Sequence, residues 1–170
     1  MTTGTVTLPR PEDVTGLGRA LAVLLRAGDL IILTGDLGAG KTTLTQGIGA
    51  GLNVRGAVTS PTFVIARLHP ALGEGPALVH VDAYRLGSTV ELDDLDLDAD
   101  IADCVTVVEW GEGLAEDLAD SHLALHLSAD PDTEVRTLRL RSVGDRWTSP
   151  ALRQALTALV ADCAGDEIGG

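Results

Sequence analysis

The octapeptide at residues 35–42 constrains this chain more than any other part of the sequence. It has the sequence G-D-L-G-A-G-K-T and fits the pattern G-x-x-x-x-G-K-[ST] at every fixed position. The glycines let successive backbone N–H groups turn toward one anion, and the positive end of a following helix adds to that attraction. The pattern therefore predicts a strand, a phosphate-binding loop and a helix in that order.

The residues on both sides of the loop supply this context. Residues 29–34 contain a short apolar run that is typical of a buried parallel strand. After the loop, Leu44, Ile48 and Leu52 are spaced by four residues, which predicts one face of a helix. Lys41 is the single lysine of the chain, and it lies where the motif needs an ammonium group for the β- and γ-phosphates. Thr42 follows, and its hydroxyl is expected to ligate Mg²⁺.

Length and charge limit the classes of protein to which the chain can belong. With 170 residues, of which 45% are hydrophobic, we expect one domain over residues 1–163 and a frayed tail over 164–170. The formal net charge of −13 leaves no broad basic face, which argues against strong direct binding to nucleic acid. No apolar run approaches the roughly 18 residues of a membrane span, so we expect no membrane contact. Two isolated cysteines, Cys104 and Cys163, fit a reducing cytoplasm.

The order of the predicted elements indicates an α/β fold of three layers, like that of P-loop NTPases, with a mostly parallel central sheet. A helix is predicted from Pro11 to Gly28, strands over 62–68, 77–81 and 104–108, and a short helix over 112–119. Residues 88–103 are acid-rich and weakly helical in pattern. Alternating residues at 122–127 and 135–140 predict a hairpin, and residues 151–161 predict a final amphipathic helix.

Two predicted strands end in an acidic residue. Asp82 follows the strand at 77–81, and Glu109 follows the strand at 104–108. Because the carboxyl ends of parallel strands meet at the edge where phosphates bind, both acids are candidates for a magnesium site. The alternative is that each acid only caps its strand and faces solvent.

The segment at residues 58–63 and the scarce aromatic residues are further candidates. Thr59, Ser60, Pro61 and Thr62 place three hydroxyl groups around a proline, where a nucleotide-sensing switch or a simple Ser-Pro turn could lie. Trp110 directly follows Glu109 in a chain with only 2% aromatic residues. It offers a flat surface for a base or a partner, or it packs at the sheet edge.

Several activities are compatible with a phosphate-binding loop. Guanine recognition usually needs an Asn-Lys-x-Asp motif, which is impossible here because Asn53 is the only asparagine and Lys41 the only lysine. Adenine is therefore favoured. A small-molecule kinase would need an arginine-bearing lid. A third possibility is a nucleotide-sensing docking module that requires no turnover. The arginines available for a lid are Arg136, Arg139, Arg141 and Arg146.

Four motifs in sequence resemble the TsaE (YjeE) family in order and spacing. They are the loop at 35–43, T-S-P-T-F at 59–63, H-V-D-A-Y-R-L at 80–86 and E-W at 109–110. The resemblance covers roughly residues 10–127. It implies a small P-loop ATPase that binds ATP and Mg²⁺ and hydrolyses ATP slowly. Such an ATPase supports the transferase pair TsaD and TsaB in forming N6-threonylcarbamoyladenosine at position 37 of tRNAs reading ANN codons, with tRNA held by the partners.

The resemblance also implies roles for individual residues. Lys41, Asp82 and Glu109 would be the catalytic residues, and Thr42, Asp82 and Glu109 would hold the metal. Residues 59–62 match the switch segment of the family, whereas the region after residue 128 matches no motif. The residues expected to bind the nucleotide are Asp36, Leu37, Gly38, Ala39, Gly40, Lys41, Thr42, Thr43 and Trp110.

Overall fold

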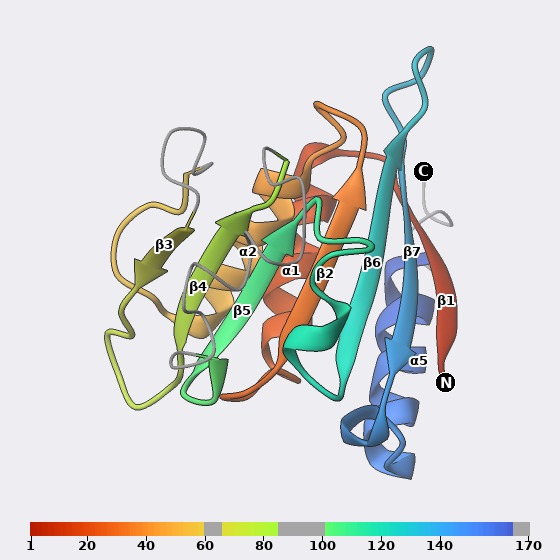
Figure 1. The fold of residues 1–170 in the computed structure, drawn as a ribbon. Coiled ribbons are helices and arrows are strands. Elements are labelled where there is room, and N and C mark those ends of the chain that lie inside the picture. Colours follow the sequence, from red (N-terminus) through yellow and green to blue (C-terminus); the bar gives the residue numbers. More distant parts are fainter. Residues whose placement is uncertain (60–65, 85–100, 165–170) are drawn as a thin grey trace.

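The computed structural model describes residues 1–59, 66–84 and 101–164. The described strands form one seven-stranded sheet with the order β1-β7-β6-β2-β5-β4-β3 (Figure 1). The strands are β1 (Thr3–Leu8), β2 (Leu30–Gly35), β3 (Ala66–His69), β4 (Ala77–Asp82), β5 (Cys104–Glu109), β6 (His122–Ala129) and β7 (Arg136–Val143). The helices are α1 (Pro11–Ala22), α2 (Lys41–Leu52) and α5 (Pro150–Ala164), with short 3-10 turns η1 (Glu116–Leu118) and η2 (Asp145–Trp147).

The centre of the sheet is parallel. Strand β2 pairs in parallel with both β5 and β6, and β5 pairs in parallel with β4. At one side β7 is antiparallel to both β6 and β1, so that β1 runs in the direction of the central strands. At the other edge β3 is antiparallel to β4. Of the seven described strands, only β3 and β7 run antiparallel to the others. The predicted α/β fold of three layers with a mostly parallel sheet is therefore confirmed.

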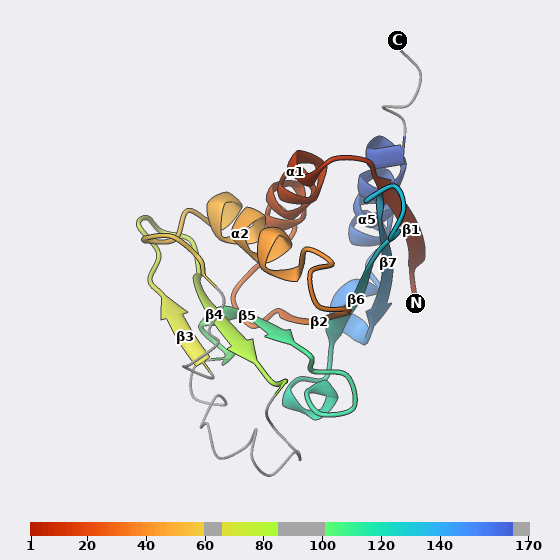
Figure 2. The ribbon, with the colours of Figure 1, turned by 90° about the horizontal axis from the view of Figure 1, so that it is seen from above.

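The main core lies between the sheet and helices α1, α2 and α5, which cover the same face (Figure 2). It is built from the apolar stripes that the helical spacing predicted, such as Leu17 and Leu21 of α1 and Leu44 and Ile48 of α2. A second apolar cluster covers the other face of the central strands, where Ala115 and the partly buried Leu118 pack over β2, β4 and β5. The parallel strands are therefore buried on both faces, as their continuous apolar runs require.

Two helix boundaries differ from the prediction. Helix α1 ends at Ala22, and Gly28, with a φ of 93°, belongs to a separate turn in which the Asp29 N–H donates to the Arg26 carbonyl at 3.1 Å. A glycine with positive φ serves such a turn as readily as a helix end. The predicted helix at 112–119 is only the 3-10 turn η1, because Gly113 has a φ of 79° and interrupts it.

Some predicted features lie outside the described residues. These are the start of the strand at 62–65, most of the acid-rich segment at 88–103 and the tail at 165–170. Within residues 1–59, 66–84 and 101–164, no helix has the length and apolar content needed to cross a membrane.

Candidate functional site

The phosphate-binding loop connects the end of β2 to the start of α2, at the carboxyl edge of the parallel strands. Gly35 closes β2 beside β6, where an added Cβ would collide with the Leu127 carbonyl oxygen. Gly40 immediately precedes α2 and has a φ of 106°, which is a left-handed conformation that favours glycine. The loop therefore needs glycine for its backbone path, as the motif predicted.

Lys41 is buried inside this loop, with only 6% of its surface exposed. Its Nζ atom donates to the carbonyl oxygens of Gly35 at 2.7 Å and Asp36 at 2.9 Å, and it lies 4.3 Å from the ring centre of Trp110. Burial lowers the pKa of Lys41, while the negative charges of Glu109, Asp82 and Asp36 oppose that shift. The ammonium group is thus held in a desolvated position, where an anion would interact strongly with it.

The two predicted acids are neighbours at the same edge. Asp82 and Glu109 are paired in the parallel register of β4 and β5, and the Ala83 N–H donates to the Glu109 carbonyl at 2.9 Å. Asp82 is half-buried, and its Oδ1 accepts a hydrogen bond from the Tyr84 N–H at 3.0 Å. The Glu109 residue is only 3% exposed, and its Oε1 lies 3.1 Å from Nε2 of His80. The structure contradicts a solvent-facing Glu109.

These residues line a cavity of about 540 Å³. It brings together the loop, both acids and Trp110, as the sequence predicted. Asp36 and Ala39 contribute backbone carbonyl contacts near it instead of lining it. Thr59 does not line the cavity and accepts a hydrogen bond from Arg67 at 3.1 Å, whereas residues 60–62 lie outside the described part. The lining residues are Leu37, Gly38, Gly40, Lys41, Thr42, Thr43, Asp82, Tyr84, Glu109, Trp110 and Arg136.

Sequence reasoning considered Arg136 only for a kinase lid and Tyr84 only as a scarce aromatic residue near Asp82, and it assigned neither to this site. Arg136 comes from the start of β7, and its Nε donates to the Ala39 carbonyl at 3.3 Å. The hairpin of β6 and β7 reaches the loop because Leu127 of β6 is paired with Gly35. Tyr84 is 70% exposed, with its ring centre 5.1 Å from that of Trp110. The signal for Tyr84 was its place two residues after Asp82.

The other arginines considered for a lid lie elsewhere. Arg146 is bound to the Asp29 carboxylate at 2.8 and 3.0 Å, and it also donates to the Leu24 carbonyl. Arg139 and Arg141 are exposed and line a different cavity. Of the four arginines only Arg136 lines the loop cavity, so the described residues provide no arginine-rich lid over it.

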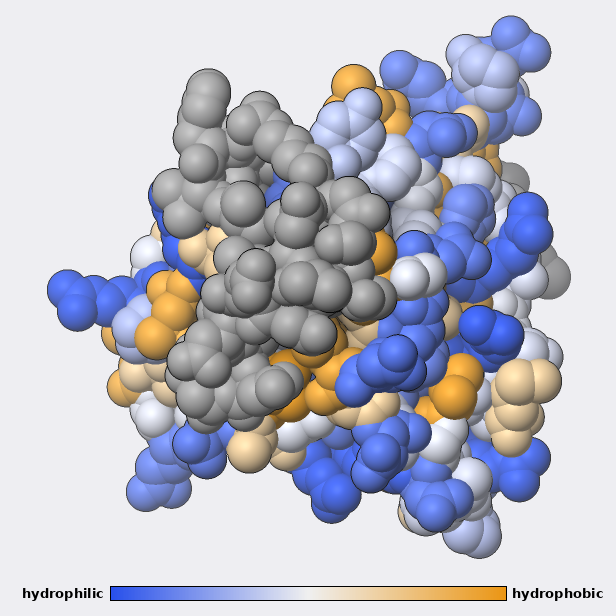
Figure 3. Space-filling model, viewed as in Figure 1, coloured by the Kyte–Doolittle hydropathy of each residue, from blue (hydrophilic) through white to orange (hydrophobic). Residues whose placement is uncertain are grey.

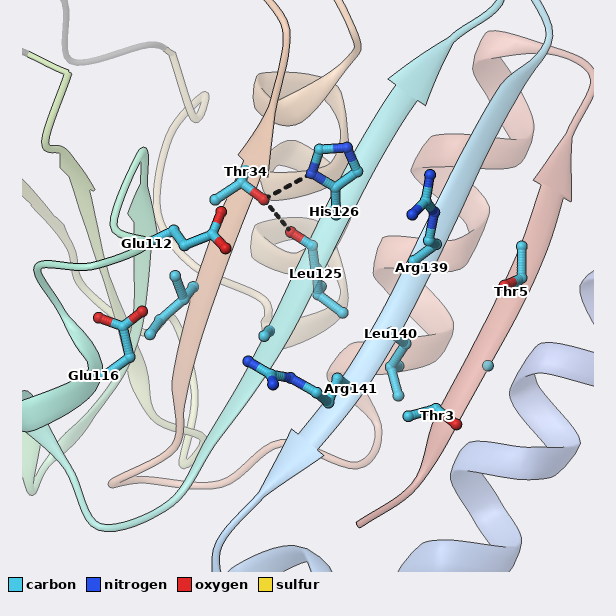
Figure 4. Close-up of a pocket in the computed structure, with 13 residues that line it drawn as sticks. Thr3, Thr5, Thr34, Glu112, Glu116, Leu125, His126, Arg139, Leu140 and Arg141 are labelled. Atoms are coloured by element: carbon cyan, nitrogen blue, oxygen red, sulfur yellow. Dashed lines mark hydrogen bonds between the residues drawn. The ribbon is translucent and has the colours of Figure 1, made fainter.

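That different cavity is larger, about 750 Å³, and lies on the sheet face away from the helices (Figure 4). Arg139 and Arg141 of β7 line it together with Glu112 and Glu116 from the segment around η1. The surface over β6, β7 and β1 is mostly hydrophilic (Figure 3). Because this groove carries exposed charges of both signs, it matches no single class of ligand.

The family model described as "Threonylcarbamoyl adenosine biosynthesis protein TsaE" matches residues 8–138 of this chain. The chain belongs to the TsaE family. The match extends beyond the resemblance at residues 10–127 and includes β6 and the start of β7 with Arg136. The family is involved in the biosynthesis of threonylcarbamoyladenosine in tRNA.

Relatives in several bacteria carry the same name, tRNA threonylcarbamoyladenosine biosynthesis protein TsaE. The protein of Streptomyces coelicolor is 61% identical over 137 residues, which cover 78% of this chain and 93% of that protein. The protein of Mycobacterium bovis is 52% identical, covering 79% and 85%, respectively. The crystal structure of Bacillus subtilis YdiB is similar with a TM-score of 0.69 and 25% identity, and the match covers 95% of this chain and 96% of that one.

Proposed function

We propose that this TsaE-family chain binds Mg²⁺-ATP in the loop cavity and hydrolyses it slowly. In doing so it supports the TsaD–TsaB transferase in forming N6-threonylcarbamoyladenosine at position 37 of tRNAs reading ANN codons. The observation that carries the proposal is the buried Lys41, held by loop carbonyls beside Glu109 and Asp82. A buried ammonium group facing a cavity of this size suits the phosphates of a nucleotide.

The donors at the cavity fit a magnesium ion. Mg²⁺ prefers hard oxygen ligands and usually keeps several waters, with one or two carboxylates and substrate phosphates completing the site. The Thr42 hydroxyl at the start of α2 and the carboxylates of Asp82 and Glu109 at the ends of β4 and β5 are donors of this kind. When bound, the ion would neutralise charge on the β- and γ-phosphates.

The residues of the chain then have distinct tasks. The loop N–H groups and Lys41 hold the phosphates, and Arg136 adds a second cation from the β7 side of the loop. Asp82 is assigned to the metal, and Glu109 to the metal and to orienting the attacking water. The rings of Trp110 and Tyr84 lie next to each other and form an aromatic surface at the cavity, which suits the nucleotide base or a docking partner.

Adenine is proposed as the base because the chain lacks the residues for guanine recognition. Asn53, the only asparagine, is the C-cap of α2 and therefore lies at the end of that helix remote from the loop. The check is competition against a bound fluorescent ATP analogue. We expect ATP to displace the analogue and GTP to be a poor competitor. Equal displacement by GTP would contradict the assignment.

The net charge of −13 suits an ATPase whose partners hold the tRNA. We therefore propose that contact with tRNA is indirect, through TsaD and TsaB, and that the chain acts in the cytoplasm. The two exposed side chains at the cavity mouth, Leu37 and Tyr84, are available for a docking partner.

The direct test is ATP hydrolysis by the purified chain, alone and with the TsaD–TsaB pair, with Lys41→Ala as the control. We expect the pair to stimulate hydrolysis that depends on Lys41. An unchanged rate without complex formation would contradict the proposal. Transfer of labelled γ-phosphate to a metabolite instead of water would then support a small-molecule kinase.

A further inference from the structure

His80 is an unusual residue for its position. It lies in the middle of β4 between apolar neighbours and is 0% exposed, as deeply buried as Leu78 and Val81 of the same strand. Burying an imidazole costs free energy unless a polar partner compensates for the lost water. The position of His80 therefore needs an explanation other than packing.

The polar side chain that His80 approaches at a measured distance is Glu109, while Arg67 and His69 of β3 are its neighbours on the other side. The imidazole Nε2 lies 3.1 Å from Glu109 Oε1, across the neighbouring strands β4 and β5. Both atoms are buried and neither has a hydrogen-bond partner in the described part of the chain, so their 3.1 Å approach is a close polar contact without hydrogen-bond geometry. His80 does not line the loop cavity, so it lies behind the carboxylate and away from any ligand bound there.

We propose that His80 is a positioning residue that fixes the Glu109 carboxylate for magnesium binding and turnover. This role rests on the proposed function. A carboxylate that binds a metal is commonly oriented by a second polar group behind it, which keeps the ligand oxygens aimed at the ion. The imidazole occupies that place here, because Glu109 Oε1 faces it at 3.1 Å while the residue itself borders the cavity.

The test compares His80→Leu and His80→Gln with the same substitutions at His122. His122 is a suitable control because it is 5% exposed, its Nδ1 also has no partner among the described residues, and it begins β6 at the end of the strands remote from the loop. The measurements are kcat, the Mg²⁺ concentration that half-saturates nucleotide binding, the nucleotide affinity in EDTA, and the melting temperature. Nucleotide binding is followed by tryptophan fluorescence.

For His80→Leu we expect kcat to fall and the half-saturating Mg²⁺ concentration to rise by about 10- to 100-fold, the usual effect of losing such a supporting group. Nucleotide affinity in EDTA should not change. His80→Gln should recover part of both losses, because its amide can donate to Glu109. The His122 variants should change only the melting temperature.

The positioning role would be overturned if His80→Leu and His122→Leu had the same kcat and the same half-saturating Mg²⁺ concentration. In that case, Mg²⁺-dependent nucleotide binding by the wild-type chain would still support the proposed function. If His80→Leu does not fold, the comparison of His80→Gln with His122→Gln decides. A lower kcat and weaker Mg²⁺ binding in His80→Gln support the positioning role. Equal kcat and equal Mg²⁺ binding in the two variants overturn it. A wild-type chain without any Mg²⁺-dependent nucleotide binding would overturn the proposed function and this role with it.

Discussion

The two cavities of this sheet differ in how their charged side chains are held. In the loop cavity, Lys41 and Glu109 are 6% and 3% exposed, and the negative charge of Glu109 acts on Lys41 at the carboxyl edge of the parallel strands. In the larger groove over β6 and β7, the side chains of Arg139 and Arg141 are exposed. Buried opposite charges are costly to assemble, whereas exposed charges are ordinary surface features. Buried charges that line a cavity, and not cavity size, therefore distinguish the candidate functional region.

Replacing the buried cation should have the largest effect. Lys41→Ala removes the ammonium group from the loop, and we expect ATP hydrolysis to fall by at least about 100-fold, as when a charge-stabilising donor is lost from an active site. Arg141→Ala removes an equally cationic group from the groove and should leave hydrolysis unchanged. Steady-state phosphate release by both variants is the measurement. A comparable loss in Arg141→Ala would contradict the assignment of the two regions.

Replacing the buried Glu109 should lower turnover without abolishing ATP binding. We expect Glu109→Ala to lower kcat by about 100-fold while an ATP analogue still binds, because Lys41 and the loop backbone remain. Glu112→Ala in the groove is the matched control. Stopped-flow binding and single-turnover hydrolysis check this. If the proposed support of TsaD and TsaB in tRNA modification persists in Glu109→Ala, the chain is a nucleotide-sensing module instead of an ATPase that needs turnover.

Two arginines of β7, Arg136 and Arg139, allow the two cavities to be compared within one strand. Arg136→Ala should weaken ATP binding by about tenfold, since one charge-assisted hydrogen bond contributes about 1.5 kcal/mol. Arg139→Ala, three residues further along β7, should bind ATP like the wild type. Calorimetric titration measures both affinities. Equal affinities in the two variants would remove Arg136 from the site.

The same contrast between buried and exposed charge applies to stability. The Asp29 residue is 3% exposed and binds Arg146 twice, so Asp29→Ala should lower the free energy of unfolding by about 3 kcal/mol. Asp13 pairs with Arg10 at the surface at 2.9 Å, and Asp13→Ala should cost less than about 1 kcal/mol. Urea denaturation compares the two. Similar losses would show that burial does not set the strength of these pairs.

The smallest expected effect is a pH dependence of the free energy of unfolding that arises from His122 of β6. Burial lowers the pKa of His122 below its ordinary value of 6.5, and the charge of Arg141 adds to this while Glu116 opposes it. The unfolded chain therefore takes up more protons as the pH falls through about 6.5, and the free energy of unfolding should decrease until the lower folded pKa is reached. His122→Gln should lose less stability than the wild type between about pH 7.5 and about pH 5.5.

The local part of the site was predictable from sequence, and the part set by distant pairings was not. Lys41 and Thr42 belong to one contiguous motif whose backbone geometry is carried by its glycines. Asp82 and Glu109 followed from the rule that parallel strands end at one edge. Arg136 could not be placed, because its position depends on pairing β6 with β2, almost a hundred residues apart in sequence.

His80 shows the same limit. The sequence predicted a buried strand at 77–81 but not which side chain would face Glu109, because that depends on the register between β4 and β5. The end of α1 was misplaced for a local reason, since a glycine with positive φ is common both after helices and in turns. The sequence therefore predicts local geometry where a single motif fixes it. It does not decide between two local structures that favour the same residue, such as a helix end and a turn that both favour glycine.

The most direct test of the account is calorimetric titration of a non-hydrolysable Mg²⁺-ATP analogue into three proteins: the wild type, Lys41→Ala and Arg139→Ala. We expect one site per chain in the wild type and in Arg139→Ala, and no measurable binding in Lys41→Ala. Binding that persists in Lys41→Ala, or disappears in Arg139→Ala, would contradict the claim that the buried charges at the loop form the nucleotide site.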